Sequence, residues 1–160
     1  MAKDKMNIPQ IRFKGFEGEW VLQKLDKVSN SISSGKDKQE IAGLYDLYGS
    51  TGVIGKSLLA SYSGKYILIA RVGANAGYLQ NISGQFSVTD NTLVLDLKEQ
   101  FSVNFVFCLL KHFNLNRLVF GSGQPLITGG QLKELSLFFT NFKEQTQIGD
   151  FFQKIDQVIE

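Results

Sequence analysis

The sequence predicts an α+β fold, in which a curved, mixed β-sheet forms the core and helices lie near both ends of the chain. Residues 41–95 hold only five charged side chains but eight of the sixteen glycines, and short β-type runs alternate there with glycine turns. Helical periodicity marks residues 103–113 and returns in residues 141–160, where it forms one apolar stripe. We therefore expect a C-terminal amphipathic helix that projects from the sheet domain.

The N-terminal segment is expected to form an arm followed by a helix. Residues 8–18 contain Pro9 and separated apolar side chains, which favours an extended arm. From about Glu19 the spacing of apolar residues is compatible with one helical face, formed by Trp20, Leu22, Leu25 and Val28. The serine-rich residues 29–34 would end this helix, and the charged residues 36–40 would form a loop.

The middle of the chain is expected to supply the sheet, with short strands over residues 44–48, 66–72, 78–82, 86–89 and 92–97. The run Tyr66-Ile67-Leu68-Ile69-Ala70 is continuously apolar, which is typical of a strand buried on both faces. A helix should follow Ser102 over residues 103–113. Two further short strands are expected near residues 118–120 and 135–139.

The last segment has the clearest periodicity in the sequence. Its apolar stripe consists of Ile148, Phe151, Phe152, Ile155, Val158 and Ile159. Asn141, followed three residues later by Glu144, resembles a capping box at the start of the helix. The stripe either packs back on its own domain or meets a partner helix, because the 148/151/155/158 spacing also fits a coiled-coil seam. Periodicity slightly favours the partner helix.

The bulk composition indicates one ordinary globular domain. A chain of 160 residues with 43% hydrophobic residues can bury a sizeable core. No apolar run approaches the ~18 residues of a membrane span, and the first residues lack the apolar stretch of a signal peptide. The single cysteine, Cys108, excludes an internal disulfide and fits a reducing compartment. We expect a soluble, cytoplasmic protein with no membrane partner.

Charge alone does not indicate a nucleic-acid partner, because the net charge is only +2. Residues 1–134 carry 15 Lys and Arg against 11 Asp and Glu, whereas residues 135–160 carry 2 against 4. The body of the chain is therefore mildly basic and its tail mildly acidic. A solvated surface with random charge placement often gives such a division.

The sequence does not indicate catalytic chemistry. The only histidine, His112, follows Cys108 by four residues on the expected helix, but its neighbours are mostly apolar and one His–Cys pair lacks the ligands for a zinc site. The segment Gly52-Val53-Ile54-Gly55-Lys56-Ser57 superficially resembles a phosphate-binding loop, yet two residues separate its glycines where that motif has four. We expect no catalytic residue, metal or cofactor in this chain.

Four polar, glycine-rich segments are explained neither by the core nor by the strands. They cover residues 47–55, 70–77, 88–92 and 120–128. Tight turns would explain any one of them, because glycine adopts positive φ and Asn, Asp and Ser cap turns. Neutral hydrogen-bonding side chains together with Arg71 also suit contacts to base edges and phosphates. The residues alone favour turns over DNA contact, and both alternatives stay open.

In this order the segments resemble the target-recognition domains of type I restriction–modification specificity subunits, and the resemblance covers nearly the whole chain. The matching segments are Pro9-Gln10-Ile11-Arg12-Phe13-Lys14-Gly15-Phe16-Glu17-Gly18-Glu19-Trp20, Tyr48-Gly49-Ser50-Thr51-Gly52, Ile69-Ala70-Arg71-Val72-Gly73, Thr89-Asp90-Asn91-Thr92, Gly121-Ser122-Gly123-Gln124-Pro125, and Glu144-Gln145 with Ile148 and Phe152. Each motif is weak by itself, but their ordered combination is specific. The last of them looks like the start of the family's long conserved helix.

The resemblance implies a division of labour. Specificity subunits read a split DNA site, usually with two recognition domains held apart by two antiparallel helices. Modification subunits, which use S-adenosylmethionine, dock on that scaffold and methylate adenine, and a restriction subunit cuts DNA. The specificity subunit has no catalytic role. The resemblance therefore implies that residues 1–140 form a target-recognition domain and residues 141–160 begin the spacer or coiled-coil helix.

This sequence departs from the family pattern in two respects. It contains one recognition domain where the family usually has two, and its conserved helix ends at Glu160, several turns early. We expect a half-subunit or a truncated form, and the short helix puts pairing of two copies in doubt. A protein-interaction module that binds or inhibits the modification subunit without reading DNA is the alternative function.

Within the resemblance, the candidates for base or backbone contacts are Ser50, Thr51, Arg71, Asn75 and Gln124. Arg is the commonest partner of guanine, and Asn or Gln of adenine. Candidates for phosphate contacts are Lys36, Lys38, Lys56, Lys65 and Lys133. Residues 89–91 and 129–130 are expected to stabilise the fold, because side chains shared by a family with different targets should not read bases. The same argument weighs against Arg71 and Gln124.

Overall fold

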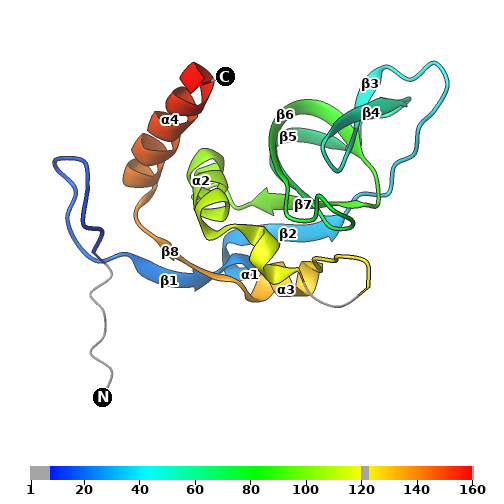
Figure 1. Cartoon of the computed structure of the whole chain (residues 1–160). Helices are drawn as coiled ribbons and strands as arrows, with labels where there is room; N and C mark the ends of the chain where they lie inside the picture. The colour runs from blue at the N-terminus through cyan, green and yellow to red at the C-terminus, as the bar shows by residue number, and fades with distance from the viewer. Residues whose placement is uncertain (1–7, 120–122, 160) are drawn as a thin grey trace.

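The computed structural model describes residues 8–119 and 123–159. The elements follow the order β1 (Val21–Lys24), α1 (Leu25–Val28), β2 (Ser29–Ser34), β3 (Tyr45–Gly49), β4 (Gly52–Ser57), β5 (Tyr62–Ala70), β6 (Leu79–Val88), β7 (Thr92–Leu97), α2 (Val103–Phe113), the 3-10 helix η1 (Leu115–Leu118), α3 (Gly129–Glu134), β8 (Ser136–Phe139) and α4 (Phe142–Ile159). Figure 1 shows α4 at one end of the molecule and the β3–β4 hairpin at the other. The expected α+β class is confirmed.

The main sheet has six strands in the order β2-β7-β5-β6-β3-β4. All neighbours are antiparallel except β3 and β6, which run parallel, so the sheet is mixed as expected. Gln80, near the start of β6, donates from Nε2 to the carbonyl of Gly49 at 3.0 Å, while Val88, at its end, pairs with Tyr48. Because both ends of β6 meet the same end of β3, β6 must curl round (Figure 1).

A pair of glycines allows this curl. Gly64 of β5 and Gly84 of β6 lie opposite one another in the ladder, with φ of +138° and +113°. L-residues with side chains rarely adopt such angles, whereas glycine does so without steric cost. Both strands can therefore bend at the same level, and the β5–β6 ribbon folds over into a curved sheet.

The curved sheet has an apolar cluster on each face. Ile67 and Ile69 pack into the main core with α1, α2, α3 and β8, whereas Leu68 packs into a smaller cluster with Phe86, Val88 and Val94. Residues 67–70 are completely buried, which confirms that this strand is covered on both faces. The helices on one face and the curl of the sheet on the other provide that cover.

The expected N-terminal helix is wrong. Residues 21–24 form β1, which pairs with β8 in a separate two-stranded sheet, and only Leu25–Val28 makes one helical turn. The serine-rich residues expected to end the helix form β2, which pairs with β7. Pairing with strands far along the chain overrides the local apolar spacing here.

Three smaller expectations also differ from the structure. Residues 78–82 and 86–89 belong largely to one long strand, β6, because Gly84 bends the chain without ending the ladder. The segment Leu115–Leu118 is a 3-10 helix instead of leading into a strand, and residue 120 of the expected strand lies outside the described residues. No strand is expected directly after residue 48, but Gly52–Ser57 forms β4, which begins inside the glycine segment 47–55 and pairs with β3.

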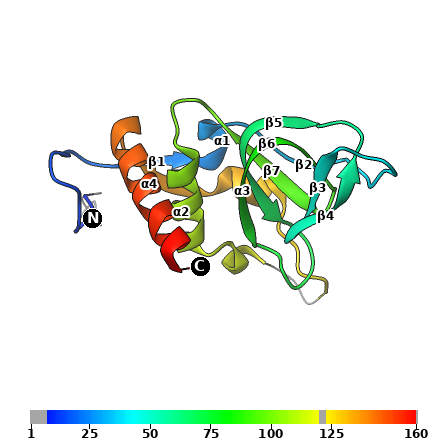
Figure 2. The same cartoon turned by 90° about the horizontal axis from the view of Figure 1, so that it is seen from above.

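The expected helices over residues 103–113 and the last segment are confirmed as α2 and α4. Figure 2 shows α2 lying beside α4, and Gly149 of α4 lies against the start of α2. At the start of α4, Asn141 Oδ1 accepts from the backbone nitrogen of Glu144 at 2.9 Å, as the capping pattern predicts. None of the helices in the described part of the chain has both the length and the apolar character needed to cross a membrane.

Candidate nucleic-acid interface

Four polar loops from distant parts of the sequence meet at one end of the main sheet. They are the β3–β4 turn at residues 50–51, the segment 71–77 after β5, the β6–β7 turn at residues 89–91, and the segment 123–127 before α3. Backbone hydrogen bonds join three of them directly: Arg71 N to Asn91 O (3.1 Å), Gly73 N to Pro125 O (3.0 Å) and Ile127 N to Arg71 O (2.8 Å). A further bond, Thr89 N to Tyr48 O (3.0 Å), joins the β6–β7 turn to the end of β3, which leads into the β3–β4 turn. The described parts of the four segments singled out in the sequence therefore form one surface.

The segment 71–77 is the centre of this surface, because it contacts both the 89–91 turn and the 123–127 segment. It closes on itself through bonds from Ala76 N to Gly73 O (3.1 Å) and from Gly77 N to Ala70 O (2.8 Å). Gly77 has a φ of +98°, and a Cβ there would lie 2.9 Å from the backbone nitrogen of Asn116. Glycine is therefore required here both by the backbone angle and by the close approach of η1.

The Arg71 side chain is half-buried and points back to the β6–β7 turn. Its Nη1 donates to the carbonyl of Asp90 at 3.2 Å, and its backbone nitrogen donates to the carbonyl of Asn91. In that turn, Thr89 and Thr92 both donate from their hydroxyls to Asn91 Oδ1. These contacts agree with the expected structural role of residues 89–91, and they give Arg71 a structural contact in addition to any base contact.

The other base-contact candidates lie on the same loops. Thr51, Asn75 and Gln124 are exposed and Ser50 is half-buried. The carbonyls of Gly49 and Ser50 accept from Gln80 Nε2 at 3.0 and 3.3 Å, so the Gln80 side chain of β6 holds the β3–β4 turn in place. Gln80 is not among the candidate residues, because β6 contains several polar side chains and nothing in the sequence distinguishes this one.

The five lysine candidates do not gather in one place. Lys36 and Lys38 flank Asp37, whose carboxylate accepts from Val88 N at 3.0 Å, so both lie beside the β6–β7 turn. Lys56 forms an exposed ion pair with Asp46, with 2.6 Å between Nζ and Oδ1. Lys65 lies in a different region, the cleft between β6, α2 and α4. Lys133 is exposed on α3, the short helix that directly follows the 123–127 segment.

Comparison with known families identifies the fold's relatives. The sequence model of the type I restriction modification DNA specificity domain matches residues 16–160. The chain belongs to this family. A curated relative, the EcoprrI type I restriction enzyme specificity subunit of Escherichia coli, is 31% identical over 120 residues, which cover 75% of this chain and 30% of that protein.

Solved structures support the same fold for this specificity domain. The type I restriction–modification S subunit from M. genitalium superposes with a TM-score of 0.73 at 19% identity, covering 98% of this chain and 41% of that one. The HsdS subunit from Thermoanaerobacter tengcongensis gives a TM-score of 0.66 at 15% identity, covering 96% of this chain and 41% of its own. This chain therefore spans less than half the length of these relatives.

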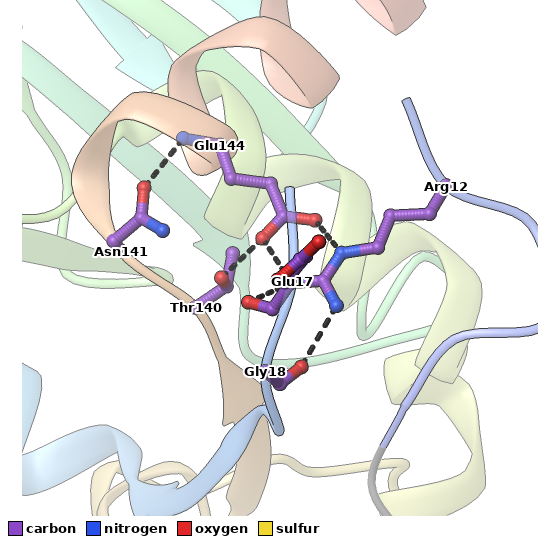
Figure 3. Close-up of polar contacts among 6 residues, drawn as sticks. All are labelled: Arg12, Glu17, Gly18, Thr140, Asn141 and Glu144. Atoms are coloured by element: carbon purple, nitrogen blue, oxygen red, sulfur yellow. Dashed lines mark hydrogen bonds and ion pairs between the residues drawn. The ribbon is translucent and has the colours of Figure 1, made fainter. Parts of the chain in front are cut away.

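The specificity domain ties its N-terminal arm to the start of α4 through a buried ion pair (Figure 3). Arg12 donates from Nε to Glu144 Oε1 and from Nη2 to Oε2, both at 2.7 Å, and Thr140 Oγ1 also donates to this carboxylate. Burial alone would raise the pKa of Glu144, but the Arg12 and Thr140 hydrogen bonds and the Arg12 charge hold that pKa below its ordinary value. Both residues belong to motifs visible in the sequence, but nothing in the sequence pairs them.

The apolar stripe of α4 is divided between core and surface. Ile148 is half-buried and packs against the main core, whereas Phe151, Phe152, Ile155, Val158 and Ile159 are exposed. Phe13 of the arm contacts Phe151 edge-on, with 5.4 Å between ring centroids. A groove of about 400 Å³ lies between α2 and α4, lined by Trp20, Leu109, Ile148 and Phe152 among others. The helix thus offers a continuous apolar surface at its C-terminal half.

The Cys108–His112 pair of α2 is unsuited to nucleophilic catalysis. Burial raises the pKa of the Cys108 thiol to about 11, so the thiol stays protonated near neutral pH. His112 is exposed on the neighbouring turn. Across residues 8–119 and 123–159, no three His, Cys, Asp or Glu side chains come together as metal ligands.

Proposed function

We propose that this specificity domain recognises one half of a bipartite DNA target as part of a type I restriction–modification specificity subunit. It has no catalytic role and directs the methyltransferase and restriction subunits to their site. The observation that carries the proposal is the meeting of the four polar loops at one end of the sheet. Loops from a rigid scaffold are a common way to present binding side chains.

Base contacts are assigned to the exposed polar side chains of these loops. Asn75 and Gln124 suit adenine, and Ser50 and Thr51 suit several bases or the sugar-phosphate backbone. Arg71 suits guanine, provided that its guanidinium leaves the Asp90 carbonyl. Lys36 and Lys38, beside the same loops, suit phosphates. Lys56 and Lys65 are weaker candidates, because Lys56 is paired with Asp46 and Lys65 lies in the cleft beside α2 and α4. Lys133, on the helix that follows the 123–127 segment, stays a candidate for a phosphate contact.

The assembly follows from the same proposal. Residues 1–140 are the target-recognition domain, and residues 141–160 begin the spacer helix. The exposed stripe of α4 pairs with another helix, either from a second specificity half or from further chain. The partner methyltransferase uses S-adenosylmethionine, whereas this domain needs no cofactor. The assembly acts in the cytoplasm, where its DNA is.

One observation favours a second candidate function. Val158 and Ile159 are 86% and 77% exposed at the end of α4, and Phe151, Phe152 and Ile155 of the same stripe are also exposed. An exposed apolar patch of this kind often marks a surface that binds a partner. A module that binds or inhibits the modification subunit without reading DNA would bind it through α4, and the four loops would contact no bases.

The deciding experiment is selection from randomised duplex DNA by the domain, with and without the partner methyltransferase, over a range of salt concentrations. Enrichment of a short half-site supports DNA reading and names the target. Retention without any enriched sequence, in the presence of bound methyltransferase, favours the assembly module. A variant with Asn75→Ala and Gln124→Ala should lose the enrichment. Gln100→Ala, in the turn between β7 and α2 at the opposite end of β7 from the 89–91 turn, should retain it.

A further inference from the structure

A single buried amide, Asn104, connects the curved sheet to α4. Its Oδ1 accepts from Lys65 Nζ of β5 at 2.8 Å and from Asn81 Nδ2 of β6 at 2.9 Å. Its Nδ2 donates to Asp150 Oδ1 at 3.1 Å and to Gln153 Oε1 at 2.7 Å, both on α4. Asn104 is only 7% exposed. One side chain therefore joins three elements of the fold.

The amide of Asn104 is used to its full capacity. Its oxygen accepts two hydrogen bonds, both from the sheet, and its nitrogen donates two, both to α4. These partners fix the orientation of the amide, because a flipped amide would place its NH₂ donor against the Lys65 ammonium, which is also a donor. No other side chain of this length supplies two acceptors on one side and two donors on the other.

Gly149 brings α4 close to this amide. A Cβ on Gly149 would lie 2.5 Å from Phe105 N and 2.9 Å from the Asn104 Cβ, distances that side chains essentially never show. The two helices therefore touch backbone to backbone at this point. Beyond Gly149, Asp150 and Gln153 of α4 accept from the Asn104 amide, so hydrogen bonds add to the apolar packing that holds this part of the helix.

We propose that Asn104 is a positioning residue that, with Gly149, fixes the direction in which α4 leaves the sheet. Resting on the proposed function, this direction sets where the neighbouring specificity half stands relative to the reading loops, and so the spacing between two DNA half-sites. Asn104 does not touch DNA in this proposal. It acts through α4.

The first test exchanges donor for acceptor in the full chain. Asn104→Asp places a carboxylate beside Asp150, and the two like charges should release α4. Adding Asp150→Asn restores a donor toward that carboxylate and should rescue the contact. Hydrogen exchange of the α4 amides beyond Gly149 should accelerate about tenfold in Asn104→Asp, as expected for losing one or two net hydrogen bonds. Exchange in β5 and β7 should be unchanged, and the double variant should return α4 to the wild-type rate.

A second readout measures direction itself. Spin labels at Ser63→Cys on β5 and Lys154→Cys on α4, in a Cys108→Ala background, report the distance between sheet and helix. This distance distribution should be narrow in the parent, broaden in Asn104→Asp and narrow again with Asp150→Asn. Gly149→Ala should shift its centre, because the added methyl pushes the helices apart. Asn116→Ala, which removes an amide bond to Ala76 O at the far end of α2, should leave it unchanged.

The proposal is overturned if Asn104→Asp leaves both α4 exchange and the label distance unchanged. It is also overturned if exchange rises equally in β5 and β7, or if Asp150→Asn does not rescue α4, since both results indicate general destabilisation. Neither measurement uses DNA. Failure of half-site selection by the wild-type domain would therefore refute the proposed function while leaving the coupling of α4 to the sheet to be judged separately.

Discussion

Arg12 and Glu144, 132 residues apart in the sequence, form a bidentate ion pair in which the Glu144 side chain is 1% exposed and that of Arg12 12%. The same guanidinium donates to the carbonyls of Gly18 at 2.7 Å and Glu17 at 3.1 Å. One side chain therefore closes the N-terminal arm and anchors it to the first turn of α4. A bidentate geometry of this kind cannot be reproduced by lysine.

Replacing Arg12 by Met should markedly lower the free energy of unfolding, because the Glu144 carboxylate would remain buried without its partner. The matched control is Lys24→Met, which breaks the exposed Lys24–Glu134 pair (51% and 72% exposed side chains) and should cost little. Urea unfolding of both variants measures the difference. Equal losses would mean that the Arg12–Glu144 pair acts like a surface pair.

The ion pair should also make stability depend on pH in the acid range. The folded-state pKa of Glu144 is lowered, so its contribution is fully present above the ordinary glutamate pKa of about 4.5 and is lost as pH falls through the folded value. The stability difference between wild type and Glu144→Gln should be largest near about pH 6 and shrink toward about pH 3. Chemical denaturation at several pH values measures it. A difference independent of pH would contradict the assignment.

Arg71→Ala should weaken binding to the selected half-site by about 1–3 kcal/mol and relax the preference at one base pair if Arg71 reads a base. Arg117→Ala is the matched control, because the Arg117 guanidinium lies over the Phe113 ring, 4.7 Å from its centroid, and donates to the Phe113 carbonyl. Titration with the target and with single-base variants separates the two effects. Unchanged affinity and base preference in folded Arg71→Ala would leave Arg71 only its contact with the Asp90 carbonyl.

Lys36→Ala and Lys38→Ala should weaken binding to all sequences equally. Each should reduce the slope of log affinity against log salt concentration by about 1, if each lysine neutralises one phosphate. Lys154→Ala on α4 removes the same charge far from the β6–β7 turn and should keep the slope. A salt titration on random duplex makes the comparison. An unaltered slope in both loop variants would remove these lysines from the interface.

Val158→Glu should weaken association through α4 without affecting the fold. Val158 is 86% exposed, so the charge is solvated in the monomer but would be buried in a helix pair. Gln157→Glu, at a neighbouring exposed position, supplies the same charge as a control. Sedimentation over a range of concentrations, alone and with the methyltransferase, measures the effect. Equal association of both variants and the wild type would place the pairing surface elsewhere.

Local patterns predicted those elements in which the same burial pattern continues along the whole segment. The apolar run of residues 66–70 predicted a strand covered on both faces, and periodicity predicted α2 over residues 103–113. The family was also visible, because its motifs keep their order along the chain. Each of these features can be predicted without knowing which distant segment of the chain packs against it.

The helix expected from Glu19 failed for the opposite reason. Its apolar spacing is real, but Val21 pairs with Phe139 in a strand ladder, and Leu25 and Val28 enter the main core from a single turn. Likewise, the curl of β6 depends on Gly64 and Gly84 standing opposite one another, which neither glycine reveals by itself.

The sequence by itself determined the types of most elements, the family and the polar segments that stand out from the core. Only the tertiary structure decided that Thr89, Arg71 and Pro125 lie in one surface, that Lys65 lies in another, and that Asn104 joins the sheet to α4. The physical reason is that element type follows from nearest neighbours along the chain. A site depends instead on strand register and helix packing between segments far apart in sequence.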